Sequence, residues 1–238
     1  MHKTLIEYKI HKSIIIVLIL MSSCSSDMRD IDRGLIAWFP FNGKAVNMAD
    51  SSCSILGEAI LTADRFDREN SAYYFDGMGS VIWTTLESAP EYQSPQTISW
   101  WFYTDTLQTF AEDMGAGNMI VLVNPESGTG LQFGFRGTGY ETKGFDVWKW
   151  GGGTILEIEQ PSSRTWHHCA YTFDGNTHRF YMDGLEIGIS RESPQSGKPT
   201  ILMFGNYPSG HQFLKGKLDD IRIYNRAHSS AEVIQLYK

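Results

Sequence analysis

Three neighbouring stretches between residues 166 and 225 constrain the fold more than any other part of this chain. In each of them the side chains alternate with a period of two: Phe180 and Met182 flank Tyr181, and Ile221 and Ile223 flank Arg222. A period of two is typical of β-strands that bury one face and expose the other. This part of the chain is therefore predicted to be a succession of strands.

Turn residues separate these strands. Asp174-Gly175 and Asp183-Gly184 supply the positive-φ residues that tight reversals require, so consecutive strands are expected to pair as hairpins. Along the whole chain about thirteen short strands are predicted, at a spacing of roughly ten residues that is typical of two-sheet sandwiches. The expected strands are Leu35–Phe39, Ala72–Phe75, Val81–Thr84, Thr97–Tyr103, Met119–Val123, Leu131–Phe135, Phe145–Trp150, Ile155–Ile158, Trp166–Phe173, Arg179–Met182, Glu186–Ser190, Thr200–Phe204 and Lys217–Tyr224.

One helix is expected, at the C-terminus. Ser229 and Glu232 stand at capping-box spacing, and Val233 and Leu236 follow on an apolar side. We therefore expect an all-β fold, a two-sheet antiparallel jelly-roll sandwich with a short C-terminal helix. Residues 34–238 are long enough for a single well-buried core, and their composition marks no internal linker.

The N-terminus has the features of an export signal. Lys3, Lys9 and Lys12 form a basic leader, residues 14–21 are an unbroken apolar run, and Cys24 follows two serines. Eight apolar residues span about 12 Å as a helix, too short for a hydrocarbon core of about 30 Å. The arrangement resembles the bacterial lipoprotein signal, which implies removal of residues 1–23 and lipidation of Cys24. Ordinary cleavage without a lipid is the alternative.

The rest of the chain is acidic. Residues 1–23 carry three Lys and one Glu, so the net charge of −7 for the whole chain becomes −9 for residues 24–238. Phosphate contacts need clustered Lys and Arg, which argues against nucleic-acid partners. Residues 24–33 are polar and acidic enough for a flexible tether. With membrane contact through the lipid anchor, the expected location is the cell envelope.

Two further cysteines remain, Cys53 and Cys169. In an oxidising compartment they can form a disulfide. Cys169, however, stands in the middle of a predicted strand, where a cysteine behaves as a small buried apolar residue, whereas Cys53 lies in a polar loop. We favour unpaired cysteines, with the disulfide as the alternative.

Five segments carry a family resemblance, in this order along the chain: GLIAWFPFNGKAVNMADSS, AYYFDGMGSVIW, TISWWFY, TWHHCAYTFDGNTHRFYMDGLEIG and GKLDDIRIYNRAHSSAEVIQLY. They resemble the concanavalin A-like jelly rolls of the laminin-G/pentraxin type on bacterial surface proteins, including those of Bacteroidetes. By analogy with those proteins, the resemblance implies a surface-exposed outer-membrane lipoprotein. The resemblance covers residues 34–238 and implies the fold. It implies no single function, because the fold carries sugar binders, protein binders, spacers and hydrolases.

The family resemblance also implies a structural Ca²⁺ ion as a cofactor. Calcium takes about six to eight oxygen ligands, many of them backbone carbonyls, so a site needs few carboxylates. In this chain the matching positions are Asp76, Asp219, Asn42 and Asp50. The alternative is that Asp76 is a turn residue before Gly77 and that Asp219 or Asp220 is a solvated strand residue.

No paired-carboxylate motif of the sandwich glycosidases is recognised. Glu157 and Glu159 share one face of a predicted strand, but Gln160 stands where a third acid would be needed. We interpret these two residues as exposed acids of a hairpin, and we expect no catalytic residues.

A group of histidines suggests a second kind of chemistry. His167 and His168, with Asp174 and His178, invite a metal or acid–base interpretation. The family resemblance instead implies that His168 belongs to a recurring strand-start pattern with a structural role. We favour the structural interpretation.

Aromatic residues between two predicted strands mark a candidate ligand site. Indole rings pack against the C–H groups of sugars, and neighbouring polar side chains take the hydroxyls. The candidate residues are Trp148, Trp150, Asp146, Tyr140 and Arg136. The alternative is that one or both indoles belong to the core.

A weaker candidate is a rim at Asn206, Tyr207, His211 and Gln212. Of the adjacent pair Trp100 and Trp101, at most one can face the core, so the other covers the opposite face of its sheet.

The expected function is therefore a noncatalytic module of a cell-surface lipoprotein that binds carbohydrate. A protein-binding adhesion or assembly module is the first alternative, and a glycoside hydrolase-related sandwich is the second.

Overall fold

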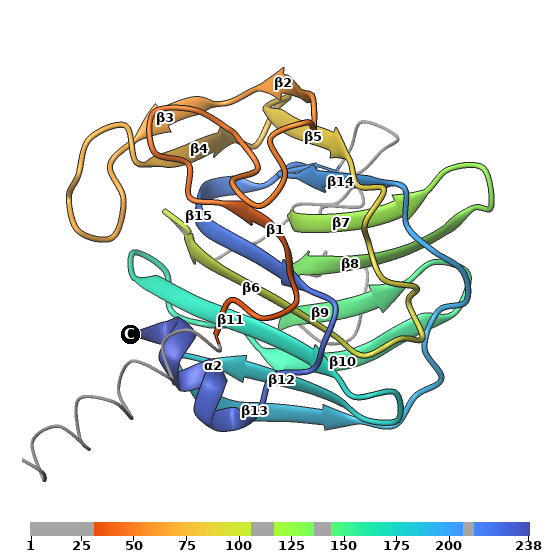
Figure 1. Ribbon diagram of the computed structural model, residues 1–238. Helices are drawn as coiled ribbons and strands as arrows, with labels where there is room; N and C mark the ends of the chain where they lie inside the picture. Colours follow the sequence, from red (N-terminus) through yellow and green to blue (C-terminus); the bar gives the residue numbers. More distant parts are fainter. Residues whose placement is uncertain (1–30, 106–116, 136–143, 207–211) are drawn as a thin grey trace, which may run out of the picture. The chain divides into compact units, whose positions relative to one another are not determined.

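The strands of this chain form two antiparallel sheets that pack face to face (Figure 1). The computed structural model describes residues 31–105, 117–135, 144–206 and 212–238, and residues 35–238 form one compact unit. Within the described residues there are fifteen strands and one helix. Their bounds are β1 Leu35–Phe39, β2 Ile55–Glu58, β3 Ile60–Thr62, β4 Ala72–Asp76, β5 Val81–Thr85, β6 Gln96–Tyr103, β7 Asn118–Asn124, β8 Thr129–Phe135, β9 Gly144–Lys149, β10 Gly153–Glu159, β11 Trp166–Phe173, β12 His178–Met182, β13 Leu185–Ser190, β14 Ile201–Phe204, β15 Lys215–Tyr224 and α2 Ser230–Tyr237.

The two sheets, here called sheet A and sheet B, have a non-sequential strand order. Sheet A runs β13-β12-β11-β6-β15-β4-β3, and β1 also pairs with β15. Sheet B runs β10-β9-β8-β7-β14-β5-β2. The pairings between strands are antiparallel, which confirms the predicted all-β sandwich with a C-terminal helix.

The predicted signal sequence and Cys24 lie outside the described residues, as does most of the predicted tether. Residues 1–34 make up a separate unit. In the parts of the chain that the structure describes, no helix has the length and apolar character needed to span a membrane.

Strands β2 and β3 were not predicted, because four and three residues are too few to show an alternating pattern. Leu56 is 48% exposed and Ile60 is 59% exposed. Both strands are short and stand at sheet edges, where pairing with β5 and β4 defines them. Gly57 brings β2 against β5, since a Cβ at its φ of 91° would lie 2.2 Å from the carbonyl oxygen of Val81.

Aromatic rings from both sheets fill the core. Trp100 of sheet A lies 5.4 Å from Phe133 and 6.1 Å from Phe145 of sheet B, measured between ring centroids. Phe180 of sheet A approaches the same indole at 5.9 Å. All four side chains are buried, so the packing of large rings joins the two sheets.

The adjacent Trp101 faces the other way, as predicted. It lies on the outer face of sheet A, where Tyr237 of α2 stacks on it at a centroid distance of 5.6 Å and the Arg65 guanidinium lies 4.5 Å from its ring. The predicted capping box at the start of α2 is confirmed, because Ser229 accepts the Glu232 N–H and Glu232 accepts the Ser229 N–H.

Cys53 and Cys169 are unpaired, as we favoured from the sequence. Cys169 is fully buried in the core, whereas Cys53 is half-buried in the loop before β2.

Candidate functional site

A row of side chains crosses the outer face of sheet B, the face turned away from sheet A. Its members are Trp148, Gln132, Val121, Met203 and Trp83, each the Cα partner of the next. Their chain neighbours, such as Val147 and Leu202, belong to the core, so the pleat turns the row outward. Both indoles and the methionine are half-buried, which leaves part of each accessible to a ligand.

The second predicted indole, Trp150, lies beside this row on the same face. A Cβ added to Gly130 would meet three ring atoms of Trp150 at 2.7 to 3.0 Å, so one face of the indole rests on the backbone of β8. The indole N–H donates to Gln132 Oε1 at 3.0 Å, and the Trp150 carbonyl accepts from Gln195 at 2.7 Å. These contacts fix a half-buried ring whose second face points away from the strand.

A polar row lies next to the aromatic one. Glu157 of β10, Asp146 of β9, Gly134 of β8 and Asn118 of β7 are successive Cα partners. Asp146 is buried and Glu157 is exposed. Because Gly134 has no side chain, Asp146 and Asn118 face each other across the backbone of β8.

Gln212 closes the polar row at β7. The Asn118 side-chain amide donates to Gln212 Oε1 at 2.8 Å, and the Asn118 N–H donates to the Gln212 carbonyl at 3.1 Å. Gln212, one residue of the weaker rim candidate, therefore lies next to the candidate ligand site on one face of sheet B.

Of the predicted ligand residues, the structure brings Trp148, Trp150 and Asp146 together on one face. Tyr140, Arg136, Tyr207 and His211 lie outside the described residues. Neither described indole belongs to the core cluster, so the alternative of two core tryptophans does not apply. Sequence reasoning missed Gln132 and Trp83, although each alternates with core residues in its strand and so carried the required pattern.

Three of the four predicted calcium ligands, Asp76, Asp50 and Asp219, have separate partners. Asp76 accepts N–H groups from residues 78–80 at 2.9 to 3.2 Å, and these bonds lower its pKa to about 2. Asp50 binds the N–H and hydroxyl of Ser52, and Asn42 is exposed in the loop after β1. These contacts of Asp76 agree with the alternative that it is a turn residue before Gly77.

Asp219 also lies away from Asp76. Lys215 is the residue paired with Asp76, and Asp219 stands four residues further along β15, about 13 Å away. Among the described residues, no group of three or more His, Cys, Asp or Glu side chains is placed to hold a metal ion. Asp76 and Asp219 therefore lie apart along the pair of strands β4 and β15. Whether the protein binds calcium stays a prediction, which melting with and without a chelator would test.

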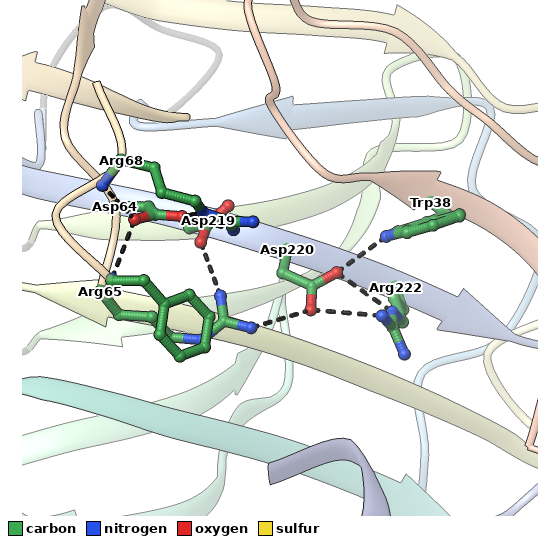
Figure 2. Close-up of polar contacts among 8 residues, drawn as sticks. Trp38, Asp64, Arg65, Arg68, Asp219, Asp220 and Arg222 are labelled. Atoms are coloured by element: carbon green, nitrogen blue, oxygen red, sulfur yellow. Dashed lines mark hydrogen bonds and ion pairs between the residues drawn. The ribbon is translucent and has the colours of Figure 1, made fainter. Parts of the chain in front are cut away.

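Asp219 instead belongs to a charged cluster on the outer face of sheet A, shown in Figure 2. A register shift in β15, with Asp220 at a φ of 46°, turns two consecutive carboxylates to this face. Asp219 accepts from Arg65 at 2.7 Å, and Asp220 accepts the Trp38 indole N–H at 2.7 Å and the Arg222 Nε–H at 3.1 Å. This cluster ties the β3–β4 loop and β1 to β15.

Burial sets the ionisation of this cluster. It raises the pKa of Asp219 to about 7, with Asp220 and Asp64 acting in the same direction, and it outweighs the opposing charge of Arg65. Each carboxylate in the close-up already has an arginine partner, because Arg68 binds Asp64 and Arg222 binds Asp220. We interpret the cluster as structural.

The histidines have structural partners as well. His168 Nε2 lies 2.8 Å from Ser99 Oγ, and burial lowers the His168 pKa to about 3, so this ring stays neutral. His167 bridges Ser162 at 2.9 Å and Asp183 at 2.7 Å, which joins the loop after β10 to the β12–β13 turn. His178 contacts the Tyr171 hydroxyl at 2.7 Å.

Two characterised proteins share short stretches of similar sequence. An asparagine-rich protein of Margaritifera margaritifera is 34% identical over 59 residues, which are 25% of this chain and 8% of that protein. Pappalysin-1 of Mus musculus is 29% identical over 75 residues, 29% of this chain and 5% of that protein. The matched stretches are thus a small part of each relative's length.

Solved structures of similar shape share the fold at low sequence identity. Domain 4 of AbnA, a GH43 extracellular arabinanase from Geobacillus stearothermophilus in complex with arabinotriose, has a TM-score of 0.61 and 17% identity, with 86% of this chain and 98% of that chain covered. The botulinum neurotoxin serotype D binding domain has a TM-score of 0.62, 11% identity and coverage of 89% and 52%. Trypanosoma rangeli sialidase has a TM-score of 0.61, 13% identity and coverage of 86% and 32%.

The sequence itself matches a family profile over most of the described domain. The profile of the concanavalin A-like lectin/glucanases superfamily covers residues 76–234, from the end of β4 to within α2. This range includes every strand that contributes to the two rows on sheet B. The chain therefore belongs to the concanavalin A-like lectin/glucanases superfamily.

Proposed function

We propose that this domain is a noncatalytic module that binds a carbohydrate chain on the outer face of sheet B. The observation that carries the proposal is the position of Trp150, whose ring lies on Gly130 and donates to Gln132, directly beside Trp148. Two partly accessible indoles with a carboxamide between them supply both surfaces that a sugar needs, one for its C–H groups and one for its hydroxyls.

The rigidity of these rings supports binding. Trp150 is held through its indole nitrogen, its carbonyl and the backbone beneath it, so little side-chain freedom remains to be lost when a ligand arrives. Asp146, buried two residues before Trp148, places a carboxylate among the neighbouring groups. Carboxylates are strong acceptors for sugar hydroxyls.

The comparisons support a saccharide ligand only by similarity of fold. The arabinanase domain was solved in complex with arabinotriose, and this chain covers 98% of its length. We therefore include arabino-oligosaccharides among the first probes.

Affinity electrophoresis tests the proposal. Purified protein is run in gels that contain linear arabinan, xylan or laminarin, beside the variants Trp148→Ala and Trp148→Tyr. We expect one of these polysaccharides to retard the protein, Trp148→Ala to abolish the retardation and Trp148→Tyr to retain part of it. Unchanged retardation in Trp148→Ala, with a melting temperature close to that of the wild type, would place the site elsewhere.

A glycoside hydrolase is the second candidate function, because one observation favours it. Glu157 and Asp146 are direct cross-strand partners, and such Cβ atoms lie about 4.5–5.5 Å apart. Carboxyl groups of retaining glycosidases stand about 5 Å apart. Release of reducing sugar by the wild type, and its loss in Glu157→Gln, would replace the noncatalytic proposal with this one.

The placement of the module at the cell surface is a separate proposal. It rests on the lipoprotein-like sequence around Cys24. Metabolic labelling with a palmitate analogue tests it, with Cys24→Ser as the control that should lose the label.

If polysaccharides fail and cross-linking on intact cells captures an envelope protein at Trp148, the domain is a protein-binding module.

A further inference from the structure

A second aromatic row crosses the opposite side of the domain, on the outer face of sheet A. Its members are Trp166 of β11, Tyr103 of β6, Lys217 of β15, Tyr74 of β4 and Ile60 of β3, each the Cα partner of the next. The row therefore runs straight across five strands. At about 4.8 Å between neighbouring strands it is roughly 19 Å long.

The pleat directs this row outward. Phe102 and Leu218, the chain neighbours of Tyr103 and Lys217, are buried in the core between the sheets. The three aromatic side chains and the lysine are half-buried, and Ile60 is 59% exposed. The row is thus open to solvent along its length and does not belong to the core.

Contacts within the row order its rings. The ring centroids of Trp166 and Tyr103 lie 5.8 Å apart, and the Lys217 ammonium lies 5.0 Å from the centre of the Tyr103 ring. Burial and the nearby Asp105 carboxylate, which follows the end of β6, raise the pKa of the Tyr74 hydroxyl. The row therefore combines aromatic rings with groups that can donate or accept hydrogen bonds.

The row is bordered by a covered strip on one side. There Tyr237 of α2 stacks on Trp101, and Arg65 covers the same indole at 4.5 Å. On the other side lie Asp76 and Lys215, which are Cα partners at the end of β4 and the start of β15. The row is therefore flanked by covered side chains on one side and by accessible charged side chains on the other.

Charges of both signs border this row. Lys217, Lys215 and the exposed Arg164, whose side chain donates to the Asp105 carbonyl, stand beside the carboxylates of Asp105 and Asp76. Because the two signs are interspersed, the row has no block of one sign that would select a polyanion or a polycation. The row suits an elongated, uncharged ligand that presents apolar faces and hydroxyl groups.

We propose that the row from Trp166 to Tyr74 is a second binding site, which holds a neutral polysaccharide chain across the strands of sheet A. The pyranose or furanose faces pack on Trp166, Tyr103 and Tyr74, and Lys217 and the Tyr74 hydroxyl bind the sugar hydroxyls. The choice of saccharide probes rests on the proposed function, whereas the residues of the two sites do not overlap. Two sites on opposite sheets would let one module bind two chains, or two parts of a long chain, with increased avidity.

Separate variants of the two sheets test this proposal. Tyr103→Ala and Tyr74→Ala remove rings of the row, Tyr103→Phe keeps the ring as a matched control, and Trp148→Ala removes the site on sheet B. Retardation is measured in gels with the polysaccharide that binds the wild type, and stoichiometry is measured by titration calorimetry with a short oligosaccharide of the same sugar. We expect each tyrosine-to-alanine change to weaken binding to the polymer about three- to tenfold, with Tyr103→Phe close to the wild type, and the stoichiometry to fall from two oligosaccharides to one.

The outcomes separate the two proposals. If Tyr103→Ala and Tyr74→Ala bind polymer and oligosaccharide as the wild type does, the second site is overturned, and loss of binding in Trp148→Ala then still supports the site on sheet B. If the tyrosine variants lose binding and Trp148→Ala does not, the row on sheet A is the binding site and the proposal for sheet B fails. A wild-type protein that none of the polysaccharides retards overturns both. Melting curves of each variant show that a loss of binding is not a loss of folding.

Discussion

Arg65 and Asp219 form an ion pair at 2.7 Å across 154 residues of sequence, between the β3–β4 loop and the register shift of β15. Asp219 is 2% exposed, and burial raises its pKa to about 7 in spite of the arginine. A carboxyl group whose pKa is raised by folding binds its proton more tightly in the folded state. Its ionisation therefore opposes folding.

The first prediction concerns the pH dependence of stability. Asp219 favours folding most below the unfolded pKa near 3.8, and this contribution is lost as pH rises through about 7. We expect the free energy of unfolding of the wild type to fall between pH 4 and pH 7 relative to Asp219→Asn, which cannot ionise there. Urea unfolding at a series of pH values measures the difference. Parallel pH profiles for the two proteins would contradict the prediction.

A methyl group at Gly130 provides the second prediction. The added Cβ of Gly130→Ala would lie 2.7 Å from the Trp150 ring, so the indole must leave its position over β8 and give up its bond to Gln132. We expect polysaccharide affinity to fall about tenfold, although both tryptophans remain. Gly79→Ala is the matched control, because its Cβ meets nothing within 4 Å. Equal affinity of the two variants would show that Trp150 takes no part in binding.

The third prediction concerns the cap of α2. Ser229 accepts the Glu232 N–H, and hydrogen bonds to the Ser229 N–H and to Arg226 lower the pKa of Glu232 to about 2 against the effect of its burial. We expect Ser229→Ala to cost about 1 kcal/mol of stability. Because the pKa of Glu232 is depressed, its contribution is present above its unfolded pKa of 4.5 and is lost as pH falls toward 2.

Thermal unfolding of Ser229→Ala and Glu232→Gln at neutral and acid pH measures these effects. The stability difference between wild type and Glu232→Gln should shrink as the pH is lowered. A difference that stays constant down to pH 2 would rule out the depressed pKa.

Thiol reactivity gives the fourth prediction. Cys169 is fully buried and burial raises its pKa well above the usual value, while Cys53 is half-buried in a loop. We expect a maleimide reagent to modify Cys53 in the native protein and Cys169 only after unfolding, without any reductant. Mass spectrometry of the labelled peptides locates the sites. If neither cysteine is labelled until a reductant is added, the two cysteines are paired.

Alternating sequence patterns predicted most of the strands, but they did not predict which strands pair with one another. The period of two in β11, β12 and β15 showed which residues face inward, and the capping-box spacing at Ser229 and Glu232 placed α2. Strands β2 and β3 were missed because four and three residues are too few to show an alternating pattern. The local sequence of a short strand does not show which strand it pairs with at the edge of a sheet.

The candidate site was predicted only in part, for the same reason. Trp148 and Trp150 were recognised because aromatic residues near polar ones are visible in one stretch of sequence. Gln132 comes from another strand, and its contact with Trp150 depends on the register between β8 and β9. Two residues of the predicted calcium set, Asp76 and Asp219, lie apart because Asp76 pairs with Lys215, four residues before Asp219 in β15.

The sequence alone determined that this chain is an all-β sandwich with a capped C-terminal helix, because strand periodicity, turn residues and caps are local properties of the chain. The tertiary structure decided which residues meet. Only the pairing of distant strands places Gln132 between Trp148 and Trp150, aligns Trp166 with Tyr103 and Tyr74, and buries Asp219 beside Arg65. Each of these contacts depends on strand order and register, which are set by packing of the whole core.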